Sequence, residues 1–240
     1  MSFVVFLSNI QPEQTMPNNE TKSANRCKVL LVEDHPMFRD HLVQLINRDL
    51  GMSVCGEADN IRDAMRLVHE TKPDIAIVDI TLRGSSGLEL LKDLKAQDLA
   101  VNVLVLSMHD EELYAERALR AGAKGYITKN EASTEVLKAI RCVMKGEVYA
   151  SKQMTAKLLD RLTQRRTPPE LEGLETLADR ELEVFQMLGR GRSTREIAQT
   201  LGLGESTVET YRARIKEKLH LRSAAELYLR AGQWVRDHGS

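Results

Sequence analysis

The sequence predicts two domains: an α/β domain with a five-stranded, parallel, doubly wound sheet, and a smaller all-α domain of four helices. Three observations predict this organisation. Five short apolar runs alternate with five helix-length amphipathic segments in the first part of the chain. A segment containing Thr167-Pro-Pro-Glu follows. Four short helical segments, separated by glycines, make up the rest. With 240 residues, the chain has the length of two modest domains.

The apolar runs of the first domain are predicted strands, and the segments between them are predicted helices. Regular alternation of the two is typical of a parallel sheet covered on both faces. The third run is apolar at nearly every position, which indicates a central strand. Ser86 and Glu89 have the spacing of a capping box at the start of the third helix. The strands are expected at 29–32, 53–55, 75–80, 103–106 and 125–128, and the helices at 36–49, 60–71, 86–97, 110–121 and 131–145.

The rest of the chain is divided by composition. The polar N-terminal residues predict a disordered tail, in which Met16 is an alternative to Met1 as the first residue. A helix at 152–166 would be broken by Pro168. The chain is therefore expected to consist of a tail at 1–26, the α/β domain at 27–149, a linker at 150–174 and the all-α domain at 175–240.

The composition excludes several classes of protein. The formal net charge is −1, so any basic surface for nucleic acid must be local. No window approaches roughly eighteen apolar residues, so no membrane span is expected. The N-terminal apolar run lacks the features of a signal peptide. Cys27, Cys55 and Cys142 are scattered and odd in number, which predicts a reduced, cytoplasmic protein without disulfides.

Reactive side chains lie at the ends of the predicted strands. Glu33 and Asp34 follow the first strand, and Asp79 closes the third. Ser107 ends the fourth strand and Lys129 the fifth. The carboxyl ends of parallel strands meet at one edge of a sheet, where ligands bind. An acidic pair after a strand is by itself more typical of a helix cap, but this ordered set indicates a site.

Three carboxylates at one edge repel one another unless a hard cation lies among them. Mg²⁺ takes carboxylate oxygens, a carbonyl and waters in octahedral geometry. The same cation can hold a phosphoryl oxygen during transfer to a carboxylate nucleophile. A lysine and a hydroxyl would contact the other phosphoryl oxygens. The sequence therefore indicates Mg²⁺-dependent phosphoryl transfer to an aspartate.

Four segments carry a family resemblance: Lys28-Val-Leu-Leu-Val-Glu-Asp-His-Pro-Met-Phe-Arg, Ile77-Val-Asp-Ile, Leu104-Val-Leu-Ser-Met and Gly125-Tyr-Ile-Thr-Lys. In this order they resemble receiver domains of the CheY-like fold, over residues 27–145. The resemblance implies that Asp79 is the phosphoacceptor and that Tyr126 changes rotamer on activation. It implies phosphoryl contacts from Ser107 and Lys129. It also implies that Mg²⁺ is held directly by Asp34 and Asp79, through water by Glu33, and by the backbone carbonyl of Thr81.

The chain departs from the receiver pattern after the phosphoacceptor. Leu82-Arg83 stands where many receivers have Met-Pro. The loop after Asp79 is therefore expected to be less rigid than usual. No reacting group is lost.

The second domain has the pattern of a helix-turn-helix. Its helices are expected at 179–189, 194–201, 206–219 and 223–236. Ser193 with Glu196, and Ser206 with Glu209, have capping-box spacing, and glycines separate the two helices that they open. The segments Asp179-Arg-Glu-Leu-Glu-Val-Phe, Glu196-Ile-Ala and Ser206-Thr-Val resemble the LuxR-type helix-turn-helix over 175–236. With the receiver, this resemblance places the chain in the NarL/FixJ family of transcriptional response regulators.

The third helix of this domain is expected to enter the major groove of DNA. Val208, Tyr211, Ile215 and Leu219 recur at helical spacing and are expected to form its buried face. A run of basic residues is by itself more typical of a solvated helix, but within a helix-turn-helix it favours phosphate contacts. The expected DNA-contacting residues are Thr194, Ser206, Thr207, Thr210, Arg212, Arg214, Lys216 and Lys218.

Both resemblances together imply a DNA-binding transcriptional response regulator of a two-component phosphorelay. A sensor histidine kinase would phosphorylate Asp79, and the helix-turn-helix would then be freed or dimerised. The expected partners are that kinase, double-stranded DNA, a second copy of the chain on DNA and, as a candidate, RNA polymerase. The chain is not expected to be an enzyme. Its only expected reactions are the acceptance of a phosphoryl group and the slow hydrolysis of that group.

Three alternatives remain open from the sequence. A haloacid-dehalogenase-type phosphohydrolase would need a second aspartate two positions after the nucleophile, where this chain has Thr81. Glu209 keeps open a receiver that acts only as a protein-interaction module, with a helix-turn-helix that no longer reads DNA, because a carboxylate repels phosphate and accepts only from cytosine among base edges. The last helix, with Leu227, Ala231 and Trp234, would serve either as a dimer interface or as core.

Overall fold

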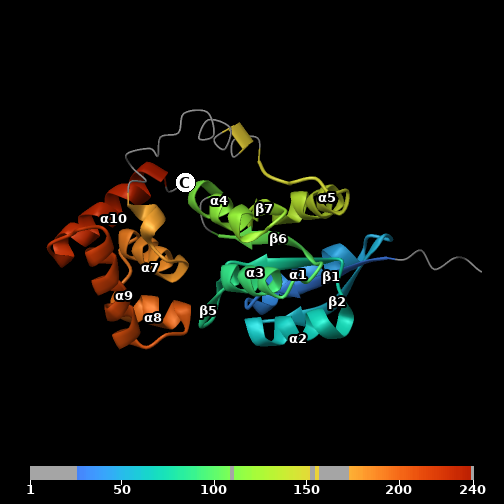
Figure 1. The fold of residues 1–240 in the computed structure, drawn as a ribbon, viewed down its shortest axis with the longest axis horizontal. Helices are drawn as coiled ribbons and strands as arrows, with labels where there is room; N and C mark the ends of the chain where they lie inside the picture. Colours follow the sequence, from blue (N-terminus) through green and yellow to red (C-terminus); the bar gives the residue numbers. More distant parts are fainter. Residues whose placement is uncertain (1–25, 109–110, 152–154, 157–172, 239–240) are drawn as a thin grey trace, which may run out of the picture.

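The computed structural model describes residues 26–108, 111–151, 155–156 and 173–238. It contains two domains, which lie side by side (Figure 1). Most of the predicted disordered tail, of the predicted helix at 152–166 and of the predicted linker lies outside the described residues, although residues 155–156 are helical. Within the described ranges, no helix has both the length and the apolar character to cross a membrane.

The first domain is built on a parallel sheet, as predicted. Within residues 26–151 the sheet has five strands in the order β2-β1-β3-β6-β7. β3 lies at its centre, and all five of its residues are buried. The strands are β1 (Cys27–Val32), β2 (Met52–Ala58), β3 (Ile75–Asp79), β6 (Asn102–Ser107) and β7 (Gly125–Thr128).

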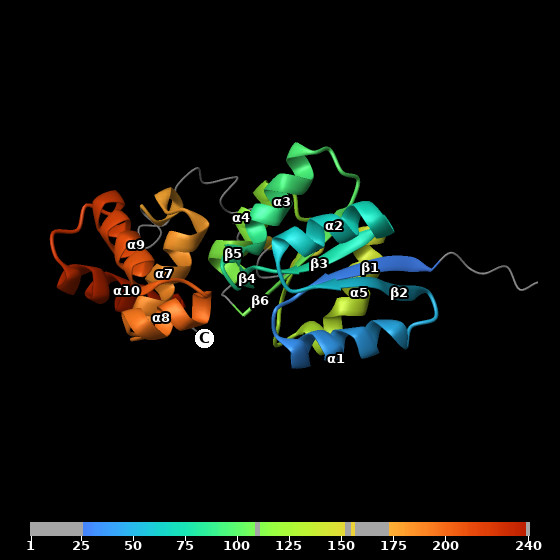
Figure 2. The same cartoon turned by 90° about the horizontal axis from the view of Figure 1, so that it is seen from below.

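Helices cover both faces of the sheet, because alternate residues of its strands are apolar on each side. Ile75 and Ile77 belong to one hydrophobic cluster, and Ala76 and Val78 to the other. Helices α1 and α5 lie on the first face, and α2, α3 and α4 on the second (Figure 2). The bounds are α1 (Pro36–Asn47), α2 (Ile61–Thr71), α3 (Gly87–Ala96), α4 (Glu111–Ala121) and α5 (Ala132–Met144).

A short hairpin that the sequence did not predict follows Asp79. It pairs β4 (Thr81–Leu82) with β5 (Ser85–Ser86) around Gly84, which has a φ of 74°. The chain then passes so close to β3 that a Cβ at Gly87 would lie 2.0 Å from the carbonyl oxygen of Asp79. Ser86 caps α3, but it accepts from the backbone N–H of Leu88, not from that of Glu89. The hairpin and this close approach therefore define the path of the chain after Asp79.

The second domain contains the four predicted helices. Within residues 173–238 they are α7 (Asp179–Gly189), α8 (Thr194–Leu201), α9 (Glu205–Lys218) and α10 (Ala224–His238), preceded by a 3₁₀ turn at Leu174–Thr176. A turn at Gly202, with a φ of 64°, separates α8 from α9. This arrangement of α8 and α9 is the expected helix-turn-helix.

Of the two capping boxes predicted in the second domain, one is confirmed and the other is wrong. Ser193 Oγ accepts from the backbone N–H of Glu196, whose carboxylate accepts from the backbone N–H of Ser193. Helix α9 instead begins at Glu205, with Gly204 at its N-cap and no side-chain cap. Ser206 therefore lies inside the helix, and Glu209 is free to bond elsewhere.

The last helix belongs to the domain core. Leu227, Ala231 and Trp234 are buried, and the Trp234 ring lies 6.4 Å from that of Phe185 on α7. The core alternative for these three residues is therefore correct, and they do not form an exposed dimer interface.

Candidate phosphoryl-acceptor site and DNA-binding surface

The predicted reactive residues meet at the carboxyl edge of the sheet. Asp79 ends β3, and Lys129 follows the last residue of β7. Lys129 Nζ lies 2.7 Å from an oxygen of Asp79 and 2.7 Å from an oxygen of Glu33. All three side chains are buried. The sheet topology therefore brings together the nucleophile and the cation that the sequence assigned to separate strand ends.

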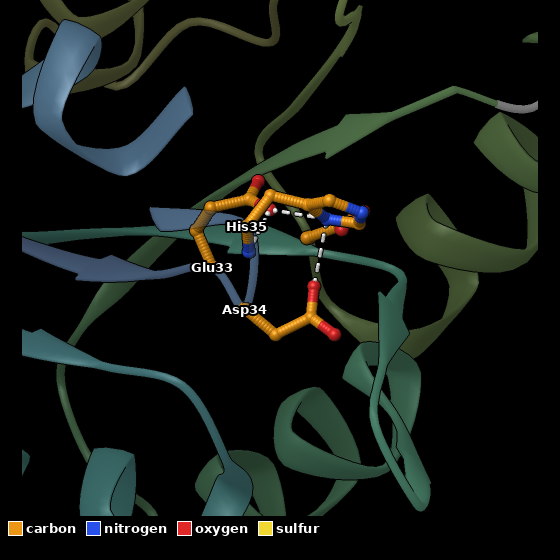
Figure 3. A group of neighbouring side chains, drawn as sticks. Glu33, Asp34 and His35 are labelled. Carbon is orange, nitrogen blue, oxygen red and sulfur yellow. Dashed lines mark hydrogen bonds and ion pairs between the residues drawn. The ribbon is translucent and has the colours of Figure 1, made fainter. Parts of the chain in front are cut away.

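Figure 3 shows Glu33, Asp34 and His35 close together after β1. With Asp79 they form what we call the carboxylate cluster. Ligand atoms of Glu33, Asp34, His35 and Asp79 all lie within 4.8 Å of one another. His35 was not among the predicted ligands; its Nδ1 lies 2.9 Å from Asp34 Oδ1 and 3.2 Å from Glu33 Oε1. Three carboxylates crowded at one edge form the oxygen-rich donor set that Mg²⁺ prefers. The residues present fit the predicted cation.

Burial affects the charge of Asp79, the predicted nucleophile. Burial raises the pKa of Asp79 to about 7; the charge of Lys129 opposes this effect, and that of Glu33 adds to it. Burial also lowers the pKa of Lys129, but pairing with Asp79 and Glu33 leaves that pKa above its ordinary value. The lysine therefore remains an ammonium that can hold negative charge at Asp79.

The other predicted residues of the receiver site lie on β4, β6 and β7. The backbone N–H of Thr81 donates to Asp79 Oδ1 over 3.2 Å. Ser107 is buried at the end of β6, and its carbonyl accepts from the backbone N–H of Lys129 over 2.8 Å. Tyr126 is buried in β7. The structure therefore gathers Glu33, Asp34, Asp79, Thr81 and Lys129. It places Ser107 at the neighbouring strand end and Tyr126 within β7, and the roles of all these residues stay predictions.

An aromatic ring that the sequence did not single out covers Lys129. Lys129 Nζ lies 4.9 Å from the centroid of the Phe38 ring, on α1. Two carboxylates hold the ammonium, and this ring faces it as well. A cation over a ring face is attracted by the negative face of the π-system. Phe38 therefore helps to hold Lys129 beside Asp79.

We expect Phe38→Leu to slow phosphorylation by a small phosphodonor about tenfold, because Lys129 is only 6% exposed and a cation–π contact contributes about 2 kcal/mol when it is desolvated. Phe38→Tyr keeps the ring face and should retain the normal rate. The rate is measured by intact-mass analysis of the full chain over time, with thermal melting as a check on folding. Equal slowing in both variants would assign Phe38 a packing role only.

The exposed face of α9 carries the predicted DNA-binding surface. Val208 and Ile215 are buried, with Tyr211 and Leu219 packed against the core, as predicted. Of the predicted contacts on this helix, Ser206, Thr207, Thr210 and Arg214 are exposed, and Lys216 is partly exposed. The remaining predicted contacts, Thr194, Arg212 and Lys218, are described next.

Three of the predicted DNA-contacting residues, Thr194, Arg212 and Lys218, bond to side chains on another helix of the domain. Thr194 Oγ1 donates to Glu209 over 2.8 Å and accepts from Arg212 Nη1 over 3.0 Å. Arg212 is also paired with Glu209, and its side chain is only 15% exposed. Lys218 Nζ lies 2.6 Å from the carboxylate of Glu181 at the start of α7. Arg212 and Lys218 thus stabilise the domain, which their spacing in the sequence did not reveal.

The receiver contacts the second domain through α4 and α3. Arg117 donates through Nη1 to the carbonyl of Leu177 and through Nη2 to that of Leu174, each over 2.8 Å. Arg117 Nη1 also lies 3.1 Å from the carboxylate of Asp179, and Lys92 Nζ lies 2.8 Å from the same carboxylate. These bonds tie the receiver to the start of α7.

A second group of contacts joins the hairpin after Asp79 to the helix-turn-helix. Arg180 Nη2 donates to the carbonyl of Leu82 over 2.8 Å. The backbone N–H of Gly84 donates to the carbonyl of Leu201, the last residue of α8, over 2.8 Å. These bonds, together with those of Arg117 and Lys92, form what we call the domain contact.

Family models match both halves of the chain. Residues 29–141 match the model described as "Response regulator receiver domain". Residues 175–231 match the model described as "Bacterial regulatory proteins, luxR family". A solved LuxR-family two-component response regulator from Aurantimonas is similar at 34% identity and a TM-score of 0.53, over 57% of this chain and 97% of that one.

Curated relatives are similar along both domains. A putative transcriptional regulator of Pseudomonas aeruginosa is 39% identical over 83% of this chain and 94% of its own length. The response regulator GacA of the same organism is 34% identical over 85% and 94%. The oxygen regulatory protein NreC of Staphylococcus haemolyticus is 32% identical over 83% and 94%. The chain therefore belongs to the NarL/FixJ family of two-component transcriptional response regulators, which join a receiver to a LuxR-type DNA-binding domain.

Proposed function

We propose that Asp79 is the residue through which a sensor histidine kinase controls this regulator. The observation that carries this proposal is the ion pair between Lys129 Nζ and Asp79 at the carboxyl edge of the sheet. A carboxylate oxygen of Asp79 attacks the phosphorus of the kinase's phosphohistidine. The P–O bond forms as the P–N bond breaks, and the departing histidine nitrogen takes up a proton. The chain acts as a regulator and not as an enzyme, apart from slow hydrolysis of this acyl phosphate.

The carboxylate cluster would hold Mg²⁺ during this transfer. Asp34 and Asp79 would bind the cation directly, Glu33 through water and Thr81 through its backbone carbonyl. The cation would supply positive charge for the phosphoryl oxygens. Lys129 and Ser107 would contact the transferred group, and Tyr126 would change rotamer in response. Support comes from the buried Asp79–Lys129–Glu33 cluster and the nearby Asp34 carboxylate.

The domain contact would restrict DNA binding until Asp79 is phosphorylated. Gly84 of the receiver lies beside the turn that joins α8 to α9. The N-terminal residues of a recognition helix are those that reach base edges. A receiver at this position would stand where the DNA backbone must approach, so opening of the domain contact would free the helix.

The freed domain would bind double-stranded DNA as a homodimer, since helix-turn-helix proteins bind paired half-sites. Ser206, Thr207, Thr210, Arg214 and Lys216 would make the contacts. RNA polymerase is a candidate further partner. We place this activity in the cytoplasm, in keeping with the free thiols of the chain.

Glu209 would tune nonspecific binding. The hydrogen bond from Thr194 holds the pKa of Glu209 below its ordinary value, so the side chain stays charged. Replacing Glu209 with lysine removes a repulsive charge and adds an attractive one. We expect Glu209→Lys to lower the free energy of unfolding by about 1 kcal/mol, because it removes the bonds to Thr194 and to the mostly buried Arg212. The variant should bind random DNA more tightly and with a steeper salt dependence. A salt titration with random DNA measures this; unchanged or weaker binding would mean that Glu209 faces away from DNA.

The proposed function is tested by selecting bound sequences from random DNA. The full chain is used with Mg²⁺, with and without a phosphoryl mimic such as beryllofluoride. Enrichment of a two-fold symmetric sequence, stronger with the mimic, is expected. Enrichment of no sequence in either state would contradict DNA recognition and favour a receiver that acts through protein contacts alone.

A further inference from the structure

Helix α7 is buried on the side that faces its own domain and also on the side that faces the receiver. All residues from 180 to 188 are buried. Phe185 packs toward Trp234 of α10. Arg180 reaches the receiver hairpin. Residues three positions apart are neighbours on a helix surface, so Glu183 lies beside Arg180, and Gln186 lies beside Glu183. Glu183 is also within electrostatic reach of Tyr114 on α4 of the receiver. We call Arg180, Glu183 and Gln186 the polar strip.

The polar strip is incompletely hydrogen-bonded. Arg180 donates to Glu183 and to the carbonyl of Leu82. Glu183 Oε1 and both polar side-chain atoms of Gln186 are buried and have no hydrogen-bond partner among the residues that the structure describes. Such atoms destabilise an arrangement, because burial removes the water that would otherwise bond to them.

The strip also lies within electrostatic reach of the phosphoacceptor. Burial raises the pKa of Glu183 to about 7; the charge of Arg180 opposes this, and the charges of Asp179 and Asp79 add to it. Negative charge at Asp79 therefore disfavours the ionised form of Glu183. The bond from Arg180 to Leu82 joins the same strip to the hairpin three residues after Asp79.

We propose that the polar strip weakens the domain contact. The closed form, in which the domain contact is made, is therefore only slightly more stable than the open form, in which the two domains are separated. When α7 separates from the receiver, Glu183 and Gln186 meet water and their missing hydrogen bonds are made. A phosphoryl group at Asp79 adds negative charge near Glu183. It also changes the surroundings of the hairpin after Asp79, to which Arg180 is hydrogen-bonded. The inference rests on the proposed function, and it names the residues that set the balance between the closed and open forms.

Two substitutions in the strip should shift this balance in opposite directions. Gln186→Met removes the amide and keeps the length of the side chain, so the ratio of open to closed chains should fall about tenfold. Arg180→Met removes the bond to Leu82 and leaves Glu183 buried without its counter-charge, so the ratio should rise about tenfold. Arg190→Met, an exposed position at the end of the same helix, should leave it unchanged.

Small-angle X-ray scattering of the full chain, with and without beryllofluoride and Mg²⁺, measures the open fraction, and thermal melting checks that each variant folds. The expected result is that Gln186→Met resists opening by beryllofluoride while Arg180→Met is open without it. If Gln186→Met melted higher but opened as readily as the unmodified chain, the amide would be unsatisfied in both forms, and the proposal would be overturned. An Arg180→Met chain that folds and stays closed would also overturn it.

The scattering result is independent of DNA. If the unmodified chain bound DNA equally with and without beryllofluoride, the proposed function would fail. The two strip variants would still decide, by scattering alone, whether the strip weakens the domain contact.

Discussion

Asp79→Asn is expected to abolish phosphorylation completely. An asparagine amide is too weak a nucleophile to form an acyl phosphate, and it offers only one oxygen to a cation. Lys129 would keep its partner Glu33, so the carboxyl edge of the sheet should stay folded. Intact-mass measurement after incubation with a small phosphodonor and Mg²⁺ gives the number of phosphoryl groups per chain.

Asp93→Asn is the matched control for this variant. Asp93 is an exposed aspartate on α3 of the same domain, and its substitution should leave one phosphoryl group per chain. Phosphate incorporation in Asp79→Asn equal to that of the unmodified chain would mean that another residue is the acceptor.

Arg117→Ala is expected to raise the DNA affinity of the unphosphorylated chain by one order of magnitude or more. Arg117 joins α4 to two carbonyls and one carboxylate of the second domain. Its guanidinium is mostly buried, so these bonds are little screened. Loss of a hydrogen-bonded charge of this kind costs about 1.5–3 kcal/mol, which corresponds to a roughly tenfold to hundredfold change in the open-to-closed ratio.

Arg120→Ala provides the control on the same helix. Arg120 is 79% exposed and pairs with Glu116 within α4. DNA affinity without phosphorylation is measured for both variants at one salt concentration, because such affinities depend strongly on salt. An Arg117→Ala chain that binds as weakly as Arg120→Ala before phosphorylation would show that the domain contact does not restrict DNA binding.

The fold and the phosphoryl-acceptor site could be predicted from the sequence because both follow from local patterns. The alternation of apolar runs and amphipathic segments fixes the parallel sheet, and parallel strands bring Glu33, Asp79 and Lys129 to the same edge. The second capping box was predicted wrongly because Ser206 and Glu209 have the right spacing but lie one residue inside a helix that begins at Glu205.

The contacts between distant segments could not be predicted in this way. Phe38 covers Lys129 only because α1 and the end of β7 meet in space. The polar residues of α7 have the pattern of a solvated helix face, yet they are buried, and Arg180 among them bonds to the carbonyl of Leu82 in the receiver. Lys218 reads as a phosphate contact in the sequence, although its partner Glu181 lies 37 residues away. Each of these depends on tertiary packing, which no local pattern records.

The most direct test of the central claim is the affinity of the full chain for a selected DNA sequence before and after complete phosphorylation of Asp79. Coupling between two sites of one protein commonly changes affinity by about 5- to 150-fold, so a rise of at least fivefold is expected. The rise should be absent in Asp79→Asn. Equal affinity in the phosphorylated and unphosphorylated states would contradict the claim that Asp79 controls the helix-turn-helix.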